Sequence, residues 1–324
     1  MPSLPLPEPV HFATGSAAPP RDGTPAPCFG RAPTACAEVM QQLTELASLR
    51  AATEHLRPRG PIALVPTMGA LHEGHLTLVR EAKRRAASVV VSIFVNPTQF
   101  GPNEDLAAYP RRLAEDARAL QAEGVDLLWA PPVEAVYPRG FATSIDVAGL
   151  SEGLCGAVRP GHFAGVATVV CKLFNQVQPD CALFGEKDWQ QLAVIRRMAR
   201  DLDLTQPNAA RIIGIPIVRE ADGLAMSSRN AYLSPEDRQR AAELPRAMRA
   251  AVERIEAGAE VPPTLADLQQ ALFAGGFSSV DYAVLADAES LAPLNRLGES
   301  PARLFVAARI GGTRLIDNMA VAAS

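Results

Sequence analysis

Two histidines stand three residues apart in residues 66–75, between a short apolar segment and an amphipathic one. His72 and His75 follow apolar residues 62–65 and precede apolar residues at positions 76, 79, 82 and 86. This order predicts a buried strand, a turn and a helix N-terminus. Such a helix start offers free N–H groups and positive potential, which favour an anion such as phosphate. Both side chains share one helix face, so both can point at that anion.

The same histidines have two other interpretations. They could cap the helix in solvent, or they could form half of a metal site. Zinc is disfavoured because no third ligand stands at a familiar spacing. Gly69 and Gly74 in the same run would let a ligand approach the backbone closely. We therefore expect a phosphate site here.

Neutral amide side chains follow the next expected strand. Asn96 and Gln99 flank Pro97, which stiffens the loop. Neutral amides suit hydroxyl groups and a carboxylate that must be oriented without being held too tightly. The alternative is that the two amides only close a turn.

A third motif, residues 185–191, joins another strand to another helix. The chain has three lysines among its 31 basic residues, and Lys187 lies in this motif. Lysine differs from arginine in shape and hydration, so its use here suggests a specific role as a compact cation. Asp188 either caps the helix or holds a cation or ribose hydroxyls. Gln191 lies one turn along, on the side of Lys187. The alternative is an ordinary aspartate cap beside a solvated lysine.

A further loop, residues 223–230, contains Ser227, Ser228 and Arg229. Two hydroxyls and an arginine on a mobile loop suit a clamp that closes over phosphate. Alone, the serine pair would read as an ordinary turn. The common nucleotide-binding loops and the nucleophile elbow of hydrolases are absent from the sequence.

The elements that must position these motifs alternate between strand and helix from about residue 60. The periodicity predicts strands at 62–67, 88–95, 125–130, 181–184 and 211–218, with helices at 75–87, 111–123, 162–177 and 188–202. This alternation indicates an α/β fold with a Rossmann-like parallel sheet, whose ligands bind beyond the carboxyl ends of the strands. A capped helix from Ser234 to about 257, a strand at 280–285 and a two-glycine hairpin at 304–316 then predict a smaller C-terminal α+β lid domain.

Composition separates the chain into three regions and excludes several classes. Residues 1–40 lack core-forming periodicity and read as a disordered or extended tail, or as the product of a misassigned translation start. We assign 41–212 to the nucleotide-binding domain and 213–324 to the lid. A net charge of −4 over 324 residues and the lack of long apolar runs argue against nucleic-acid and membrane binding. Five cysteines without paired spacing predict reduced thiols in the cytoplasm, with Cys155, Cys171 and Cys181 in the core.

Taken together, the motifs resemble those of one enzyme family. Residues 72–75 match the His-x-Gly-His signature of the nucleotidyl-transferase superfamily, and 226–229 are similar to the Lys-Met-Ser-Lys-Ser loop of class I aminoacyl-tRNA synthetases. The full set, including Tyr109-Pro110-Arg111 and the segment 311–318, appears in order from about residue 60 to 318 and closely resembles the pantothenate synthetase family. The resemblance implies ATP-dependent condensation of (R)-pantoate with β-alanine to pantothenate, AMP and pyrophosphate through a pantoyl-adenylate. It also implies Mg²⁺ and a homodimer.

The resemblance also implies residue roles. His75 is the expected proton donor, and His72, Lys187, Ser227, Ser228 and Arg229 complete the catalytic set. Pantoate is expected on Gln99 and Gln191, with Asn96 and Tyr109 nearby, and the metal on Asp116, beside Glu115. The residues expected to bind ATP are Met68, Gly69, Ala70, Leu71, His72, Glu73, Gly74, His75, Gly185, Glu186, Lys187, Asp188, Val218, Met226, Ser227, Ser228 and Arg229.

Two other functions compete with this one. A different nucleotidyl transferase would share the histidine motif but keep the nucleotide in its product. The paired glutamines and the complete Gly-Glu-Lys-Asp segment speak against it. A catalytically silent ATP-binding protein is the second competitor, and the intact histidines, Lys187 and Arg229 speak against that.

Overall fold

The computed structural model describes residues 39–102 and 104–322. The tail expected over residues 1–40 lies outside the described residues except for its last two positions, as do Cys28 and Cys36. Cys155, Cys171 and Cys181 are all buried free thiols, which confirms the expectation for these three. Within the described part, no helix combines the length and apolar character needed to cross a membrane.

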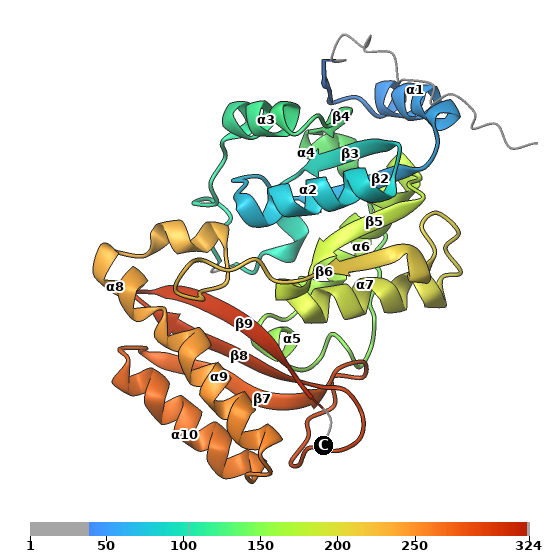
Figure 1. Ribbon diagram of the computed structural model, residues 1–324. Coiled ribbons are helices and arrows are strands. Elements are labelled where there is room, and N and C mark those ends of the chain that lie inside the picture. Colours follow the sequence, from blue (N-terminus) through green and yellow to red (C-terminus); the bar gives the residue numbers. More distant parts are fainter. Residues whose placement is uncertain (1–38, 103, 323–324) are drawn as a thin grey trace, which may run out of the picture. The chain divides into compact units, whose positions relative to one another are not determined.

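A parallel sheet forms the centre of the first half of the described chain (Figure 1). Within the described residues its strand order is β1-β4-β3-β2-β5-β6, and all neighbouring pairs are parallel. The strands are β1 (Gln41–Leu43), β2 (Ile62–Thr67), β3 (Ser88–Ile93), β4 (Leu127–Trp129), β5 (Cys181–Gly185) and β6 (Ile212–Ile215). The α/β parallel-sheet prediction is thereby confirmed.

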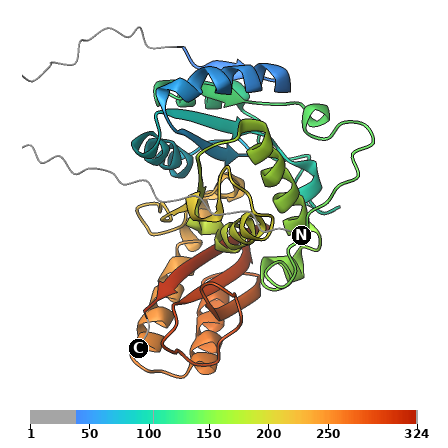
Figure 2. The same ribbon diagram turned by 90° about the vertical axis from the view of Figure 1, so that its right-hand side faces the viewer.

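Both faces of this sheet are buried, as its continuous apolar strands require. Successive residues of β2 alternate between the faces: Ile62 and Leu64 join one core, while Ala63 and Val65 join the other. Helices on opposite sides complete these cores (Figure 2). The first core takes in α1 (Leu46–Leu56), α6 (His162–Val177) and α7 (Trp189–Asp201), and the second takes in α2 (Glu73–Arg85) and α3 (Leu113–Ala122).

The strand order places a switch point beside β2. From β2 the chain first moves to β3 on one side, and it later returns to β5 on the other side. Crossover helices on either side of such a point leave a crevice at the carboxyl ends of the strands. The loops after β2, β3 and β5 carry the three predicted motifs, so the topology brings them to one edge of the sheet.

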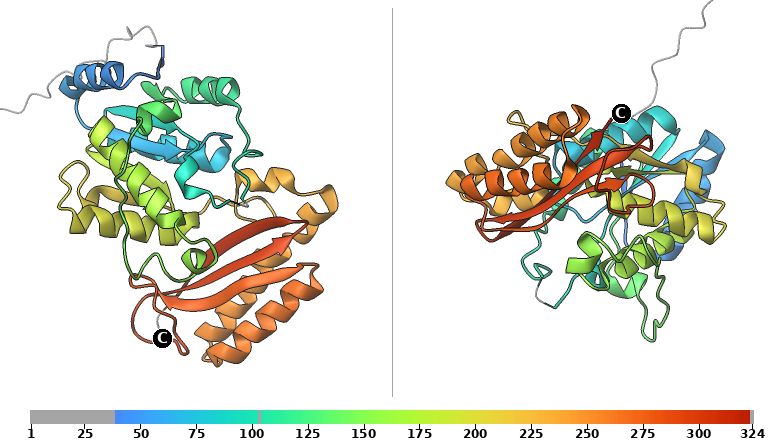
Figure 3. Two further views of the ribbon diagram at one scale, coloured as in Figure 1. Left: turned by 180° about the vertical axis from the view of Figure 1, so that it is seen from behind. Right: turned by 90° about the horizontal axis from the view of Figure 1, so that it is seen from below.

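The C-terminal half builds a second, antiparallel sheet in the order β7-β8-β9. Its strands are β7 (Ser279–Asp287), β8 (Ala302–Ile310) and β9 (Thr313–Val321). One face packs on α9 (Glu243–Glu256) and α10 (Val261–Ala274), as the views in Figure 3 show. From the other face, Phe305 joins the core that contains α7. The boundary predicted at 212/213 stays a prediction.

The predicted elements differ from the structure in several places. The single helix expected from residue 234 to about 257 is wrong: α8 (Pro235–Arg240) ends before α9 begins at Glu243. No residue of α8 is buried, whereas α9 buries Leu244 and Met248, so the chain turns to bring the apolar face of α9 onto the sheet. The sequence reading also missed β1, α1 and α10. In α10 two prolines occupy the first turn, where proline is tolerated.

Candidate active site

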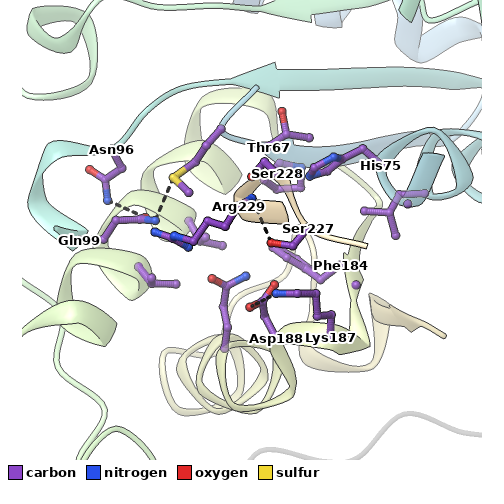
Figure 4. Close-up of a pocket in the computed structure, with 18 of the residues that line it drawn as sticks. Thr67, His75, Asn96, Gln99, Phe184, Lys187, Asp188, Ser227, Ser228 and Arg229 are labelled. Carbon is purple, nitrogen blue, oxygen red and sulfur yellow. Dashed lines mark hydrogen bonds and ion pairs between the residues drawn. The ribbon is translucent and has the colours of Figure 1, made fainter. Parts of the chain in front are cut away.

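A pocket of about 230 Å³ opens at the carboxyl ends of β2, β3 and β5. It adjoins a larger space of about 860 Å³, with which it shares Lys187, Ser227 and Arg229. Figure 4 shows side chains from the three strand-end loops and from the Ser227–Arg229 loop around the same cavity. The two spaces together reach the size typical of sites for drug-sized ligands.

The two histidines form a reciprocal cap at the start of α2. His72 Nδ1 accepts a hydrogen bond from Gly74 N at 3.2 Å, and His75 Nδ1 accepts one from His72 N at 3.3 Å. The ring centroids lie 4.1 Å apart. Because both Nδ1 atoms accept, the proton of each neutral ring must sit on Nε2. The capping interpretation and the site interpretation therefore hold together: each ring caps with one nitrogen and keeps the other as a donor.

Burial keeps both rings neutral. Desolvation, reinforced by Lys187, lowers the pKa of His72 to about 4. Desolvation, reinforced by His72, lowers the pKa of His75 to about 3. At neutral pH each ring is thus an uncharged Nε2–H donor, while the cation near them is Lys187. The two rings line the pocket.

The expected free N–H groups of the helix start are largely occupied. Besides the His72 and Gly74 amides, the amides of Ala70 and Leu71 donate to Asp116 Oδ2 and Oδ1, both at 2.9 Å. An anion in the pocket would therefore meet imidazole N–H groups in place of most of the backbone donors. The expectation of free backbone donors at the helix start is therefore wrong for the His72 and Gly74 amides, whereas Ala70 and Leu71 lie before the helix.

Asp116 anchors the turn that precedes the histidines. Its side chain is 4% exposed and does not line the pocket. The turn it holds includes Gly69 at φ +84° and Ala70 at φ +49°, and a left-handed alanine is costly without such support. The metal role expected of Asp116 stays a prediction, while the contacts assign this carboxylate a structural one.

The amides after β3 divide into a positioning group and a free group. Asn96 donates to Gly165 O and Gln99 Oε1, both at 3.1 Å, and accepts from Tyr137 at 2.8 Å. Gln99 is 8% exposed, and its Nε2 donates only to Met68 Sδ among the described residues, at 3.0 Å. Sulfur is a weak acceptor, so this amide group remains available to a ligand oxygen.

The glutamine pair on α7 divides in the same way. Gln190 is buried and binds the backbone of Leu150, Gly153 and Cys155. Gln191 lines the pocket, and no hydrogen bond joins its side chain to another described residue. The first glutamine therefore holds the structure, and the second presents its amide to the cavity.

Lys187 and Asp188 lie on the turn between β5 and α7. Lys187 Nζ lies 3.6 Å from Asp188 Oδ1, and the lysine side chain is 20% exposed. Asp188 occupies the N-cap position of α7, but its side chain makes no capping hydrogen bond. Of its alternative roles, capping is therefore not used, and the carboxylate faces the pocket. The other two lysines lie elsewhere: Lys172 stacks over Phe141, and Lys83 binds the carbonyl of Glu123.

The Ser227–Arg229 loop is held from the opposite side of the pocket. Tyr109 OH lies 3.2 Å from Ser228 Oγ. Arg229 pairs with Asp105 through Nε at 3.1 Å and Nη2 at 2.9 Å. The arginine expected to clamp phosphate thus has a carboxylate partner in this conformation.

The sequence reading missed a polar chain behind Gln99. Glu104 binds Arg159 Nε at 2.7 Å, Arg159 Nη1 donates to His162 Nε2 at 3.0 Å, and His162 Nδ1 donates to Gln99 O at 2.8 Å. Burial and the Arg159 charge lower the pKa of His162 to about 4. Arg159 and His162 stand three residues apart, just before and at the start of α6, a spacing like that of His72 and His75 that could have drawn attention to this position.

The structure brings together most of the predicted site residues. All four substrate candidates line the pocket, and so do all six proposed catalytic residues. Five of the residues expected to bind ATP do not line it: Gly69, Ala70, Leu71, Glu73 and Glu186. The first three form the anchored turn, the Glu73 carboxylate pairs with Arg80, and the Glu186 carboxylate lies 3.9 Å from Arg303.

Comparison with known proteins agrees with the fold. The family model described as pantoate-beta-alanine ligase matches residues 40–320. A pantothenate synthetase of Novosphingobium aromaticivorans is 67% identical over 283 residues, covering 87% of this chain and 99% of that protein. The crystal structure of pantothenate synthetase from Thermus thermophilus has a TM-score of 0.81 at 50% identity, covering 87% of this chain and 100% of its own.

A third relative was solved with ligands. This pantoate-beta-alanine ligase of Francisella tularensis, complexed with beta-gamma ATP and β-alanine, has a TM-score of 0.72 at 33% identity, covering 87% of this chain and 97% of its own. The family match and these solved structures cover nearly the whole described chain. The chain belongs to the pantoate–β-alanine ligase family.

Proposed function

We propose that the pocket activates pantoate with ATP and then passes the activated acyl group to β-alanine. The chain is a ligase that condenses these two substrates to pantothenate. In the proposed first step a pantoate carboxylate oxygen bonds to the α-phosphorus of ATP, and the bond to pyrophosphate breaks. In the second step the β-alanine amine attacks the acyl carbon of the pantoyl-adenylate, losing a proton as AMP leaves.

The observation that carries this proposal is that one pocket combines two chemical kinds of group. The Gln99 NH₂ group and the Gln191 amide are available to a ligand, and the imidazole donors and Lys187 line the same pocket. The amides suit the hydroxyls and carboxylate of pantoate, and the N–H donors and ammonium suit phosphoryl oxygens. A carboxylate held by the amides in the same pocket would lie beside the phosphate that it must attack, so catalysis is mainly positioning and electrostatics.

The histidines act in this scheme as neutral donors. Because the pKa values of His72 and His75 are lowered to about 4 and about 3, their Nε2–H groups carry no charge before ATP arrives. Hydrogen bonds from these groups strengthen as negative charge grows on the phosphoryl oxygens. Bound polyphosphate would also raise both pKa values, which lets His75 share a proton with the departing phosphate.

Lys187 supplies the fixed positive charge, and the Ser227–Arg229 loop closes the site. Two serine hydroxyls can donate to phosphate oxygens, and Arg229 can turn from Asp105 toward the more highly charged polyphosphate. Closure would also shield the pantoyl-adenylate from water until β-alanine attacks.

Mg²⁺ fits this site as a partner of the phosphates. Among the described residues no cluster of three or more metal-ligating side chains occurs. Mg²⁺ commonly binds through one or two carboxylates together with substrate phosphates, and the uncapped Asp188 carboxylate supplies such a group in the pocket. Bound there, the ion would neutralise phosphate charge. A homodimer and a cytoplasmic location complete the proposal, supported by the family resemblance and the reduced thiols.

Incubation with ATP, pantoate and β-alanine tests the proposal directly. Pantothenate, AMP and pyrophosphate should form in equal amounts, and pyrophosphate exchange into ATP should require pantoate alone. A product that retains the nucleotide would favour another transferase, which shares only the histidine motif. ATP binding without any product would favour a silent ATP-binding protein.

A further inference from the structure

Two adjacent residues of the C-terminal sheet contact the turn that carries Lys187 and the segment that leads into the Ser227–Arg229 loop. Asp317 and Asn318 lie on β9, and each is 2% exposed. Both belong to the segment 311–318 that contributes to the family resemblance, but no role was assigned to either from the sequence. Buried polar side chains require partners, and the partners here belong to segments of the nucleotide pocket.

Asn318 binds the turn that carries the lysine. Its Nδ2 donates to Glu186 O at 2.9 Å and to Lys187 O at 3.0 Å. Its Oδ1 accepts from Arg303 Nε at 2.8 Å, and the Arg303 guanidinium stacks 3.8 Å from the Trp189 ring centroid. This single donor to Oδ1 fixes the orientation of the amide, so both N–H bonds must go to the two carbonyls.

Asp317 binds the segment that leads into the serine-arginine loop. Its carboxylate accepts from Arg219 Nη1 at 2.6 Å and Nη2 at 2.9 Å, and the side chain is fully buried. Arg219 also donates to Gly223 O at 3.0 Å. A backbone bond from Met226 N to Val218 O, 3.0 Å long, closes this short hairpin just before Ser227.

We propose that Asp317 and Asn318 are positioning residues that fix Lys187 relative to the Ser227–Arg229 loop. The inference rests on the proposed phosphate role of Lys187. Neither residue needs to touch a substrate, because each acts through the backbone or the arginine that it holds. The Asn318 amide binds the carbonyls of both Glu186 and Lys187, which flank the Lys187 Cα. These two bonds set the direction in which the lysine side chain leaves the backbone.

A double-mutant cycle on the first half-reaction tests the Asn318 part. Pantoate-dependent pyrophosphate exchange is measured for Asn318→Ala, Lys187→Ala and the double variant. If Asn318 acts through the lysine, Asn318→Ala should slow exchange about tenfold in the presence of Lys187 and less than about twofold in its absence. The KM for pantoate should stay within about twofold of the parent value. Thr264→Ala is the matched control, since this buried side chain also binds a backbone carbonyl but lies on α10, and its exchange rate should be normal.

The outcomes separate the inference from the proposed function. If Asn318→Ala slows exchange tenfold both with and without Lys187, Asn318 does not act through the lysine. That result would overturn the inference but leave the proposed function intact. Normal exchange by Lys187→Ala would remove the phosphate role of the lysine and the inference with it. Asn318→Asp provides a second variant that keeps the shape and the Arg303 bond but sets an oxygen against the two carbonyls, so it should slow exchange at least as much as Asn318→Ala. If neither Asn318 variant folds, the residue serves the fold and the inference is overturned.

Discussion

Asp116 offers the sharpest contrast between a structural and a metal-binding role. Replacement by Asn keeps the shape but leaves one oxygen for two backbone donors, Ala70 N and Leu71 N. The new NH₂ group would face one of these N–H groups. Hydrogen bonds to charged acceptors contribute about 1.5–3 kcal/mol each, so losing one and burying an unpaired donor should cost roughly 2–4 kcal/mol. For a chain of 324 residues that corresponds to a fall of roughly 3–6 °C in melting temperature.

Thermal unfolding and a Mg²⁺ titration of pyrophosphate exchange together decide the role. The anchoring role predicts a lower melting temperature and slow exchange that excess Mg²⁺ does not restore, because the turn before His72 is displaced. Glu115→Gln is the control: that side chain is 63% exposed and 3.9 Å from Arg112, so its loss should change little. An Asp116→Asn variant with unchanged melting temperature, whose activity returns at high Mg²⁺, would refute the anchoring argument.

The remaining predictions concern the pocket side chains. Lys187→Arg should keep the fold but lose at least about tenfold in turnover, because a planar guanidinium does not replace a compact ammonium at the phosphates. Steady-state kinetics would measure this loss, with Lys172→Arg as the control variant. Equal turnover of the two variants would contradict the prediction. Titration calorimetry should show that Gln191→Ala weakens pantoate binding more than ATP binding, whereas Gln190→Ala should chiefly lower the melting temperature. The opposite result would assign pantoate binding to Gln190 and the structural role to Gln191. Burial lowers the pKa of His75 from 6.5 to about 3. Between these two values the His75 ring is protonated in the unfolded chain and neutral in the folded chain, so protonation favours the unfolded state. The contribution of His75 to the free energy of unfolding is complete above about pH 6.5 and is lost as the pH falls toward about 3. Urea unfolding at about pH 7.5 and about pH 5 should therefore show a smaller pH dependence for His75→Gln than for the parent protein. An unchanged dependence would argue against a buried neutral ring.

The site was largely predictable because its residues are grouped in short motifs behind strands. In a parallel sheet the carboxyl ends of neighbouring strands share one edge, so His75, Gln99 and Gln191 had to converge once their strands were identified. Strand identification itself rested on continuous apolar segments, which a sheet covered on both faces requires.

Other assignments required the tertiary structure because their partners are distant in sequence. Asp116 reaches a turn 45 residues away, and Asn318 reaches a loop 131 residues away. Local periodicity carries no signal for such pairs. The division of helix 234–257 into two segments also depends on the sheet beneath it, since only α9 finds an apolar surface to cover.

Residue type and local spacing specify strands, turns and donor groups, so the class of fold, the motifs and the chemistry they suit could be predicted from the sequence. Which atoms of those groups remain free depends on tertiary contacts. His72 and His75 accept capping hydrogen bonds at Nδ1, which leaves Nε2 available to a ligand. The Gln190 side chain forms hydrogen bonds with the backbone, whereas that of Gln191 forms none with the described residues. The physical reason is that hydrogen-bond capacity is filled by whichever partners folding brings near, and these partners come from elements far apart in the chain.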